Sequence, residues 1–168
     1  VGSLSSVVAS GATAKNAGSY TNTVTAGTET NYTVTPVNGS LDIAKANATV
    51  TANSGTLTYN GANQTVSGFT ASGLVGGETA SVLTGVSASR TEKNAGTYVT
   101  TASGTDGNYN LSFVNGSMVI NKAALTATGN SAQVTYNGAT QTVSGFTVSG
   151  LQGSDTVSSL STVVALGA

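Results

Sequence analysis

The sequence contains no cysteine, no histidine and no tryptophan, and it has a single proline. Without cysteine there is no disulfide bond and no thiolate metal ligand. Without histidine the protein lacks the usual general base near neutral pH and the commonest ligand for transition metals. Because these absences exclude most enzyme chemistries, we expect no catalytic residue, no cofactor, no metal site and no enzymatic activity.

Charged side chains are also scarce. Lys and Arg together number 5, and Asp and Glu number 6, among 168 residues, for a net charge of −1. Such a surface offers no basic patch for nucleic acid or for anionic lipid, and no run of about 18 apolar residues is present to insert directly into a membrane. Ser and Thr (51 residues) and Gly (22 residues) are abundant instead, so solubility rests on hydroxyl and amide groups.

Repetition is the most informative feature that is present. Residues 59–74 read YNGANQTVSGFTASGL and residues 136–151 read YNGATQTVSGFTVSGL, which match at 14 of 16 positions with an offset of 77. The segments VNGSLDIAK at 37–45 and VNGSMVINK at 114–122 have the same offset. Self-similarity at a fixed period indicates a repeat architecture, in which neighbouring units support one another.

The phase of the repeat predicts the domain organisation. If each unit begins after the Lys-Ala step, residues 46–122 form one complete repeat domain. Residues 1–45 are then the C-terminal part of a preceding repeat, and residues 123–168 are the N-terminal part of a following repeat. The 77-residue period also argues against a parallel β-helix, because its coils repeat about every 20 to 30 residues.

The complete repeat is predicted to be all-β. Thr and Val occur at high density, and β-branched side chains favour strands over helices. Seven short strands without a helix predict a small immunoglobulin-like β-sandwich. The strands are expected near residues 47–53, 56–59, 64–70, 80–89, 97–103, 108–114 and 117–122.

Local motifs predict turns and a core. Asn115-Gly116 and Asn38-Gly39 each predict a type I′ hairpin, because both residue types tolerate positive φ. The segment 94–98 (NAGTY) is either a tyrosine corner, with the Tyr98 hydroxyl anchored on nearby backbone, or a loop followed by an edge aromatic. Alternating apolar positions give the candidate core: Val50, Leu57, Tyr59, Val66, Phe69, Leu74, Val82, Leu83, Val86, Tyr98, Tyr109, Leu111, Phe113, Met118 and Ile120.

The junction between repeats has no flexible spacer. Residues 118–127 run from the last strand of one unit into the first strand of the next without Pro, Gly or a Ser-rich stretch. Because flexible linkers are rich in Gly and Ser, this junction leaves little room for a hinge. We therefore expect tandem domains in an extended, semi-rigid rod, in which each repeat has its neighbours as partners.

The order of the motifs carries a family resemblance. Each unit reads Leu-Thr-Tyr-Asn-Gly or a close variant, then Ser-Gly-Leu, then Gly-Gly-Glu-Thr at 76–79 or Gly-Ser-Asp-Thr at 153–156. Asn-Ala-Gly-Thr-Tyr and Ile-Asn-Lys-Ala follow. This order resembles the MBG/YDG-type tandem repeats of large bacterial surface adhesins, including filamentous-haemagglutinin-like proteins exported by two-partner secretion. Asn60 and Asn137 stand where the family commonly has Asp.

The six acidic residues are scattered and do not form a calcium-binding run. Glu78 and Asp155 occupy equivalent positions after Gly-rich turns, where either a backbone-capping role or a weak cation site is open, and capping is the favoured interpretation. Lys93 or Lys122 with a neighbouring Asn and an acid would suit an isopeptide cross-link only in a buried triad, and both lysines lie at predicted loops or junctions.

The resemblance implies a structural function. We expect the chain to be a stalk or filament repeat of a secreted or cell-surface bacterial adhesin, located outside the cell and supporting attachment or a biofilm matrix. The alternative is a repeat module that itself binds glycan or a protein partner. Because so few charges protect the edge strands, lateral association of rods is a further expectation.

Overall fold

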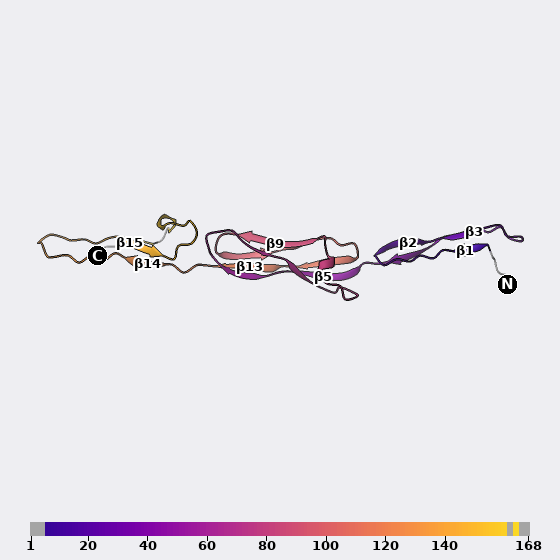
Figure 1. The fold of residues 1–168 in the computed structure, drawn as a ribbon, viewed down its shortest axis with the longest axis horizontal. Coiled ribbons are helices and arrows are strands. Elements are labelled where there is room, and N and C mark those ends of the chain that lie inside the picture. Colours follow the sequence, from indigo (N-terminus) through magenta and orange to yellow (C-terminus); the bar gives the residue numbers. More distant parts are fainter. Residues whose placement is uncertain (1–5, 161–162, 165–168) are drawn as a thin grey trace. The chain divides into compact units, whose positions relative to one another are not determined.

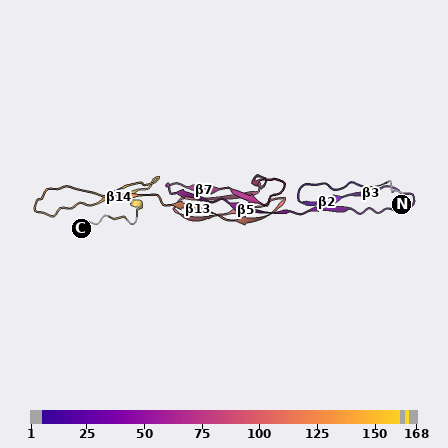
Figure 2. The same ribbon diagram turned by 90° about the horizontal axis from the view of Figure 1, so that it is seen from below.

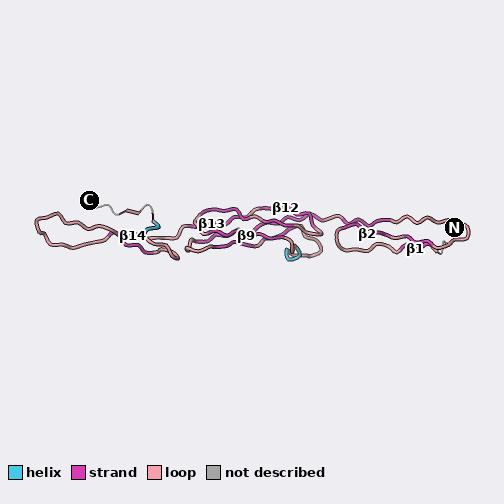
Figure 3. The backbone as a smooth tube through the Cα atoms, turned by 90° about the horizontal axis from the view of Figure 1, so that it is seen from above, coloured by secondary structure: helices cyan, strands magenta, loops and turns pink. Residues whose placement is uncertain are grey.

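The computed structural model describes residues 6–160 and 163–164. Their regular structure consists of strands and two single-turn 3-10 helices, η1 (Ala80–Val82) and η2 (Val157–Ser159), which Figure 3 colours cyan. The chain is therefore all-β, as the sequence predicts. It divides into two compact units.

The first unit contains residues 6–51, 69–87 and 102–114. In it β1 (Val7–Ala9) pairs with β3 (Val24–Ala26), and β2 (Gly18–Asn22) pairs with β4 (Gly39–Ile43), both antiparallel. A further sheet has the order β12 (Tyr109–Val114), β5 (Ala46–Ala52), β8 (Phe69–Ser72). β12 and β5 pair in parallel. β5 is labelled in Figure 1 and β12 in Figure 3.

The second unit contains residues 52–68, 88–101, 115–160 and 163–164. One sheet has the order β10 (Gly96–Thr100), β13 (Gly116–Asn121), β6 (Gly55–Thr58), in which β13 and β6 are parallel. β7 (Gln64–Ser67), labelled in Figure 2, pairs antiparallel with residues 89–92 of β9 (Val86–Glu92), whereas β11 (Ala102–Gly104) belongs to the first unit. β14 (Thr126–Gly129) and β15 (Phe146–Ser149) form an antiparallel pair.

The two parallel ladders share one register. Tyr109 lies opposite Ala46 and Met118 lies opposite Gly55, so both ladders join residues 63 positions apart. Side chains follow the same register, since the Thr49 hydroxyl lies 3.0 Å from the Ser112 hydroxyl. The first two strands of the repeat therefore pair with its last two strands.

Burial follows the strand alternation. On β5, Ala48, Val50 and Ala52 are 4%, 0% and 2% exposed, while the residues between them are half-buried. In the second unit Met118 and Ile120 of β13 pack with Val66. Six predicted core residues are buried: Val50, Val66, Leu83, Tyr109, Met118 and Ile120.

The remaining core predictions divide into half-buried and exposed positions. Val82 is 38% exposed because it lies in η1, where the alternation of a strand does not apply. Phe113 is 39% exposed because exposure rises along β12 toward its C-terminal end. Small residues that the apolar pattern passed over take part in the core instead: Ala48, Ala52, Ala88, Thr100 and Ala102.

Two predictions of local structure are wrong. The strand expected over 80–89 begins only at Val86, because η1 and the following turn satisfy the earlier backbone groups through Val82 N–H to Thr79 O and Leu83 N–H to Ala80 O bonds. The hairpins expected at Asn115-Gly116 and Asn38-Gly39 are absent, since β12 pairs with β5 while β13 pairs with β10 and β6, and β4 pairs with β2.

Gly116 allows its backbone to lie close to the backbone of Ala52 and Asn53. Its φ is not positive, so it does not form the turn that the sequence predicted. A Cβ at Gly116 would lie 2.4 Å from the carbonyl oxygens of both Ala52 and Asn53. The chain therefore passes directly against the end of β5 at this point, and only glycine leaves room for it.

We predict that Gly116→Ala lowers the free energy of unfolding by about 1–3 kcal/mol, because two backbone carbonyls must move to admit the methyl group. Gly107→Ala is the matched control, since a Cβ at Gly107 meets nothing within 4 Å, and its effect should stay within about 0.5 kcal/mol. Urea unfolding of both variants measures the difference. Equal losses for the two variants would contradict the close-approach interpretation.

Candidate functional site

The Tyr-Asn-Gly turn has the same local structure in both copies. The Asn60 Oδ1 atom accepts a hydrogen bond from the Ala62 N–H at 2.9 Å, and the equivalent Asn137 Oδ1 accepts from the Ala139 N–H at 3.0 Å. The glycines that follow have φ values of +77° at Gly61 and +75° at Gly138. An asparagine that closes the turn and a glycine with positive φ explain this tripeptide locally.

In the first copy the turn contacts a loop of the following repeat. A Cβ at Gly61 would lie 2.8 Å from the Gly153 Cα and 2.9 Å from the Gln152 carbonyl oxygen. Beside this backbone contact the Tyr59 hydroxyl donates a hydrogen bond of 2.8 Å to the Asp155 carboxylate. The two sequence motifs, Tyr-Asn-Gly and Gly-Ser-Asp, are therefore the two halves of one interface, which we call the repeat interface (residues 59–61 and 152–155).

The repeat interface borders a cavity in the second unit. Residues from the end of one repeat and the beginning of the next line it, with Tyr59 and Asp155 on its wall. The cavity is partly apolar, because Ala95, Leu125 and Leu151 contribute to it. The interface thus combines direct backbone contact, a hydrogen bond to a carboxylate and apolar side chains.

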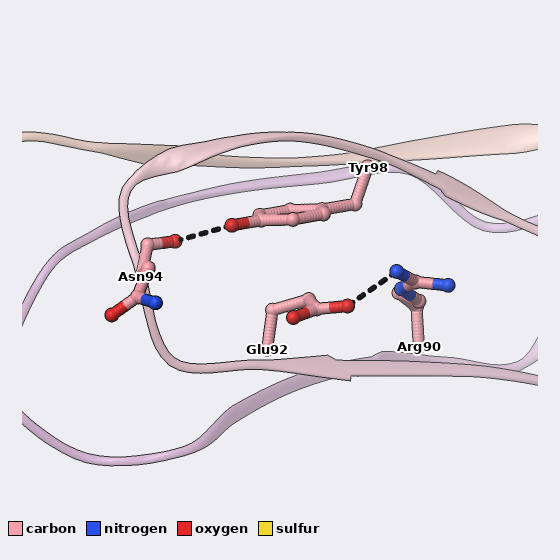
Figure 4. Close-up of polar contacts among 4 residues, drawn as sticks. All are labelled: Arg90, Glu92, Asn94 and Tyr98. Carbon is pink, nitrogen blue, oxygen red and sulfur yellow. Dashed lines mark hydrogen bonds and ion pairs between the residues drawn. The ribbon is translucent and has the colours of Figure 1, made fainter.

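A tyrosine corner shapes the loop that lines this cavity. The Tyr98 hydroxyl donates to the Asn94 carbonyl oxygen at 3.0 Å, and Tyr20 makes the equivalent bond to Asn16 at 2.9 Å. Figure 4 shows Tyr98 reaching back to Asn94, with Arg90 paired to Glu92 nearby. The Arg90 guanidinium lies 5.5 Å from the centre of the Tyr98 ring, at cation–π distance. Of the two alternatives for this segment, the tyrosine corner is confirmed.

The first unit contains the equivalent junction one repeat earlier. Here the backbone N–H of Ala17 donates to the Asn108 Oδ1 at 2.9 Å, and the Asn108 amide donates to the Asn16 Oδ1 at 3.2 Å. The Lys45 ammonium donates to the Asp106 carbonyl oxygen at 2.7 Å. Side-chain amides and one lysine therefore join residues 15–45 to the repeat that follows them.

Glu78 and Asp155 both accept hydrogen bonds from tyrosine hydroxyls. The Glu78 carboxylate accepts from Tyr109 at 2.6 Å, just as Asp155 accepts from Tyr59. These bonds come from tyrosine side chains, whereas the sequence favoured bonds from backbone N–H groups to these acids. Asp106 does cap, because its Oδ1 accepts from the N–H groups of Asn108 and Tyr109. The spacing Asp-x-Asn is typical of such caps, so this role of Asp106 could have been predicted from the sequence.

The tyrosine–acid bonds perturb both tyrosines. The hydrogen bond to Asp155, followed by burial and by the negative charge of Asp155, raises the pKa of Tyr59 above its ordinary value. The hydrogen bond to Glu78 is the main cause that raises the pKa of Tyr109, and the N–H of Val75, which donates to the same hydroxyl at 3.0 Å, acts in the opposite direction. Both hydroxyls are therefore held as neutral donors.

The other residues singled out from the sequence lie apart from this interface or on its rim. Hydrogen bonds from Ser6 lower the pKa of the Glu29 carboxyl group. Hydrogen bonds from Ser19 and, to a smaller extent, from Ser40 lower the pKa of the Asp42 carboxyl group. Lys93 and Lys122 are exposed, so neither belongs to a buried triad.

Within residues 6–160 and 163–164 no three acidic side chains come together as metal ligands. Over the same residues the structure has no helix of the length and hydropathy needed to cross a membrane.

We predict that Gly61→Ala opens the repeat interface, whereas Gly138→Ala does not. Both substitutions place a side chain at positive φ, at a cost of about 1–2 kcal/mol. Only Gly61 also faces backbone atoms closer than 3 Å, since a Cβ at Gly138 meets nothing within 4 Å. Hydrogen exchange of the amides in 152–155 should accelerate in Gly61→Ala and stay at the wild-type rate in Gly138→Ala in dilute solution. Equal protection of this loop in both variants would contradict the contact.

A second prediction concerns alkaline pH. Because the pKa of Tyr59 is raised in the folded state, its contribution to stability is fully present below the ordinary tyrosine pKa of about 10 and is lost as the pH rises through the folded value. Thermal unfolding from pH 8 to pH 11 should therefore show a smaller alkaline decrease in Tyr59→Phe than in the wild type. Tyr136→Phe, at a tyrosine that is 90% exposed, is the control and should follow the wild type.

Comparison with known proteins supports the resemblance seen in the motifs. Residues 48–119 match the family model of the MBG domain (YGX type). Searches of curated proteins and of solved structures found no match to the chain. The match runs from within β5 to within β13 and includes Tyr59 and Tyr109, which donate to the acids Asp155 and Glu78. The match over residues 48–119 is consistent with an MBG repeat of large adhesin-like proteins.

Proposed function

We propose that this chain is a structural repeat of a bacterial surface adhesin, in which immunoglobulin-like β-sandwich repeats follow one another as a stalk. The MBG domain at 48–119 suggests an adhesin-like repeat module. In this proposal the protein lies outside the cell, has no enzymatic activity, and supports attachment or a biofilm matrix by holding a binding region at a distance. The single observation that carries the proposal is the repeat interface.

The repeat interface is suited to transmitting force between neighbours. The contact of Gly61 with Gly153 is between backbones, so it depends on no flexible side chain. The Tyr59 hydrogen bond to Asp155 lies beside it. The covalent connection through Lys122, Ala123, Ala124 and Leu125 contains no glycine or proline. A short connection and a lateral contact together restrict bending more than either does alone.

The scarcity of charged side chains is consistent with a location on a crowded cell surface. The described residues contain one side-chain ion pair, Arg90 with Glu92, and the remaining polar contacts are mostly hydroxyl and amide hydrogen bonds. Interactions of this kind are less sensitive to salt than ion pairs. The same scarcity of charge leaves edge strands such as β8 with little protection, and we include lateral association of stalks in the proposal.

Small-angle X-ray scattering tests the stalk. We predict that inserting further 77-residue repeats after residue 122 increases the maximum dimension linearly, by on the order of 40 Å for each repeat, because about 13 residues of paired strand at about 3.3 Å each set the length of the unit. Dimensions that grow with the square root of repeat number would indicate flexible linkage and contradict the proposal.

A glycan array tests the alternative function. Specific binding of the 168-residue chain on such an array would favour the alternative binding module.

A further inference from the structure

The chain enters the complete repeat on strands that are bonded directly to the strands by which it leaves. It enters on β5, which begins at Ala46, and continues into β6. It leaves through β12 and then β13, which ends at Asn121. β5 pairs in parallel with β12, and β6 pairs in parallel with β13. Tension applied to the two ends of the repeat therefore acts on these two ladders first.

Parallel pairing decides how tension acts on each ladder. Tension pulls β5 toward its N-terminal end, and it pulls β12, through the strand that follows, toward its C-terminal end. Because the two strands point the same way, these pulls are opposite along the strand axis. β6 and β13 are loaded in the same manner. Each ladder is therefore sheared, and its evenly spaced hydrogen bonds resist together rather than one after another.

Further hydrogen bonds strengthen the ladder of the first unit. The Ala46 N–H donates to the Asn108 carbonyl oxygen at 2.9 Å, directly before Tyr109 begins β12. The Thr49 and Ser112 hydroxyls, which lie opposite each other in the register, are 3.0 Å apart. Bonds between the entering and the leaving strand therefore involve both the backbone and the side chains.

The ladder of the second unit is extended at both ends. The Ser117 N–H donates to the Ser54 Oγ atom at 3.0 Å just before the paired residues, and the Tyr59 N–H donates to the Asn121 carbonyl oxygen at 2.8 Å just after them. Gly116 adds close packing, because only glycine fits against the carbonyl oxygens of the entering strand. The leaving strand therefore contacts the entering strand beyond the paired residues of β6 and β13.

The β7–β9 pair provides an internal comparison. Both strands lie in the sequence between β6 and β12, and they pair antiparallel. A side-chain contact joins them as well, since the Thr65 and Thr91 hydroxyl oxygens lie 2.8 Å apart. Tension on the ends of the repeat reaches this pair only after a ladder has broken. The repeat thus contains two similar hydroxyl contacts, one on the load path and one off it.

We propose that the two parallel ladders form a mechanical clamp, which sets the force at which the repeat unfolds. The clamp rests on the proposed stalk function for the origin of the load, because a stalk that connects a cell to a second surface is placed under tension. Forced unfolding is governed by the rate of unfolding rather than by the equilibrium free energy. A repeat that stays folded under load keeps the length of the stalk constant, which is a function beyond that of a spacer.

Two attachment geometries test the clamp. The 168-residue chain has no cysteine, so two introduced cysteines define where force is applied to the full chain. Ala44→Cys with Ala124→Cys loads the ladders in shear. Ala44→Cys with Gly107→Cys pulls the N-terminal ends of β5 and β12 apart and opens their ladder one bond at a time. All three positions are exposed. At one loading rate in optical tweezers, the unfolding force should be several times larger in the shear geometry, and equal forces would overturn the proposal.

Paired threonine variants locate the resistance. Thr49→Val and Thr65→Val each remove one cross-strand hydroxyl contact and keep the shape of the side chain. At a constant force in the shear geometry, Thr49→Val should unfold about fivefold faster than the parent, which is the change in rate that the loss of one hydrogen bond corresponds to. Thr65→Val should unfold at the parent rate. Equal acceleration in both variants, or none in Thr49→Val, would overturn the proposal.

The outcomes separate the clamp from the stalk. Equal forces in the two geometries, with a maximum dimension that still grows linearly with repeat number, overturn the clamp and leave the stalk in place. A larger force in shear, with dimensions that grow as the square root of repeat number, contradicts the stalk and leaves the clamp as a property of the repeat. Circular dichroism checks that both valine variants are folded, and the attachment geometries test the clamp without either of them.

Discussion

The parallel pairing between the first and last strands of the repeat is the constraint on which the rest of the structure depends. β5 pairs with β12 and β6 pairs with β13, and both ladders join residues 63 positions apart. Parallel strands cannot be joined by a tight hairpin, so the intervening residues must return over a long path. That path contains β7 to β11 and the turn at 59–61, which is one half of the repeat interface. The ladders therefore hold in place the residues that contact the neighbouring repeats.

The sequence predicted the strands well because alternation and β-branching are local signals. Four strands of the complete repeat, β5, β6, β12 and β13, lie close to their expected positions, whereas the strands expected at 64–70 and 97–103 are each divided into two. The tyrosine corner at Tyr98 was among the stated alternatives. The pairing was less predictable, because it depends on residues far apart in the sequence. Asn115-Gly116 shows the difference. Its composition suits a hairpin, but the close approach of Gly116 to Ala52 and Asn53, a contact across more than 60 residues, determines its role.

The repeat interface could not be predicted from the sequence for a related reason. The Tyr-Asn-Gly motif has a complete local explanation, since Asn60 closes the turn and Gly61 has positive φ. Nothing within the motif indicates that Gly61 also needs to lack a Cβ in order to meet Gly153. The exposed copy at Gly138 separates the two requirements, because its φ is the same and its surroundings are open. Gly138 is therefore needed only for its backbone conformation, whereas Gly61 is needed both for its backbone conformation and for its close contact with Gly153.

The scarcity of charge gives the few acids present a particular role. A carboxylate surrounded by many lysines would find an ion pair on the surface, where such pairs contribute little. In this chain Glu78 and Asp155 instead accept hydrogen bonds from tyrosine hydroxyls, and such bonds to a charged acceptor are stronger than those between neutral groups. Glu78 is bonded within its own repeat and Asp155 across the junction, yet the two are equivalent positions. The acid at this position therefore binds a tyrosine of its own repeat in one copy and a tyrosine of the preceding repeat in the other.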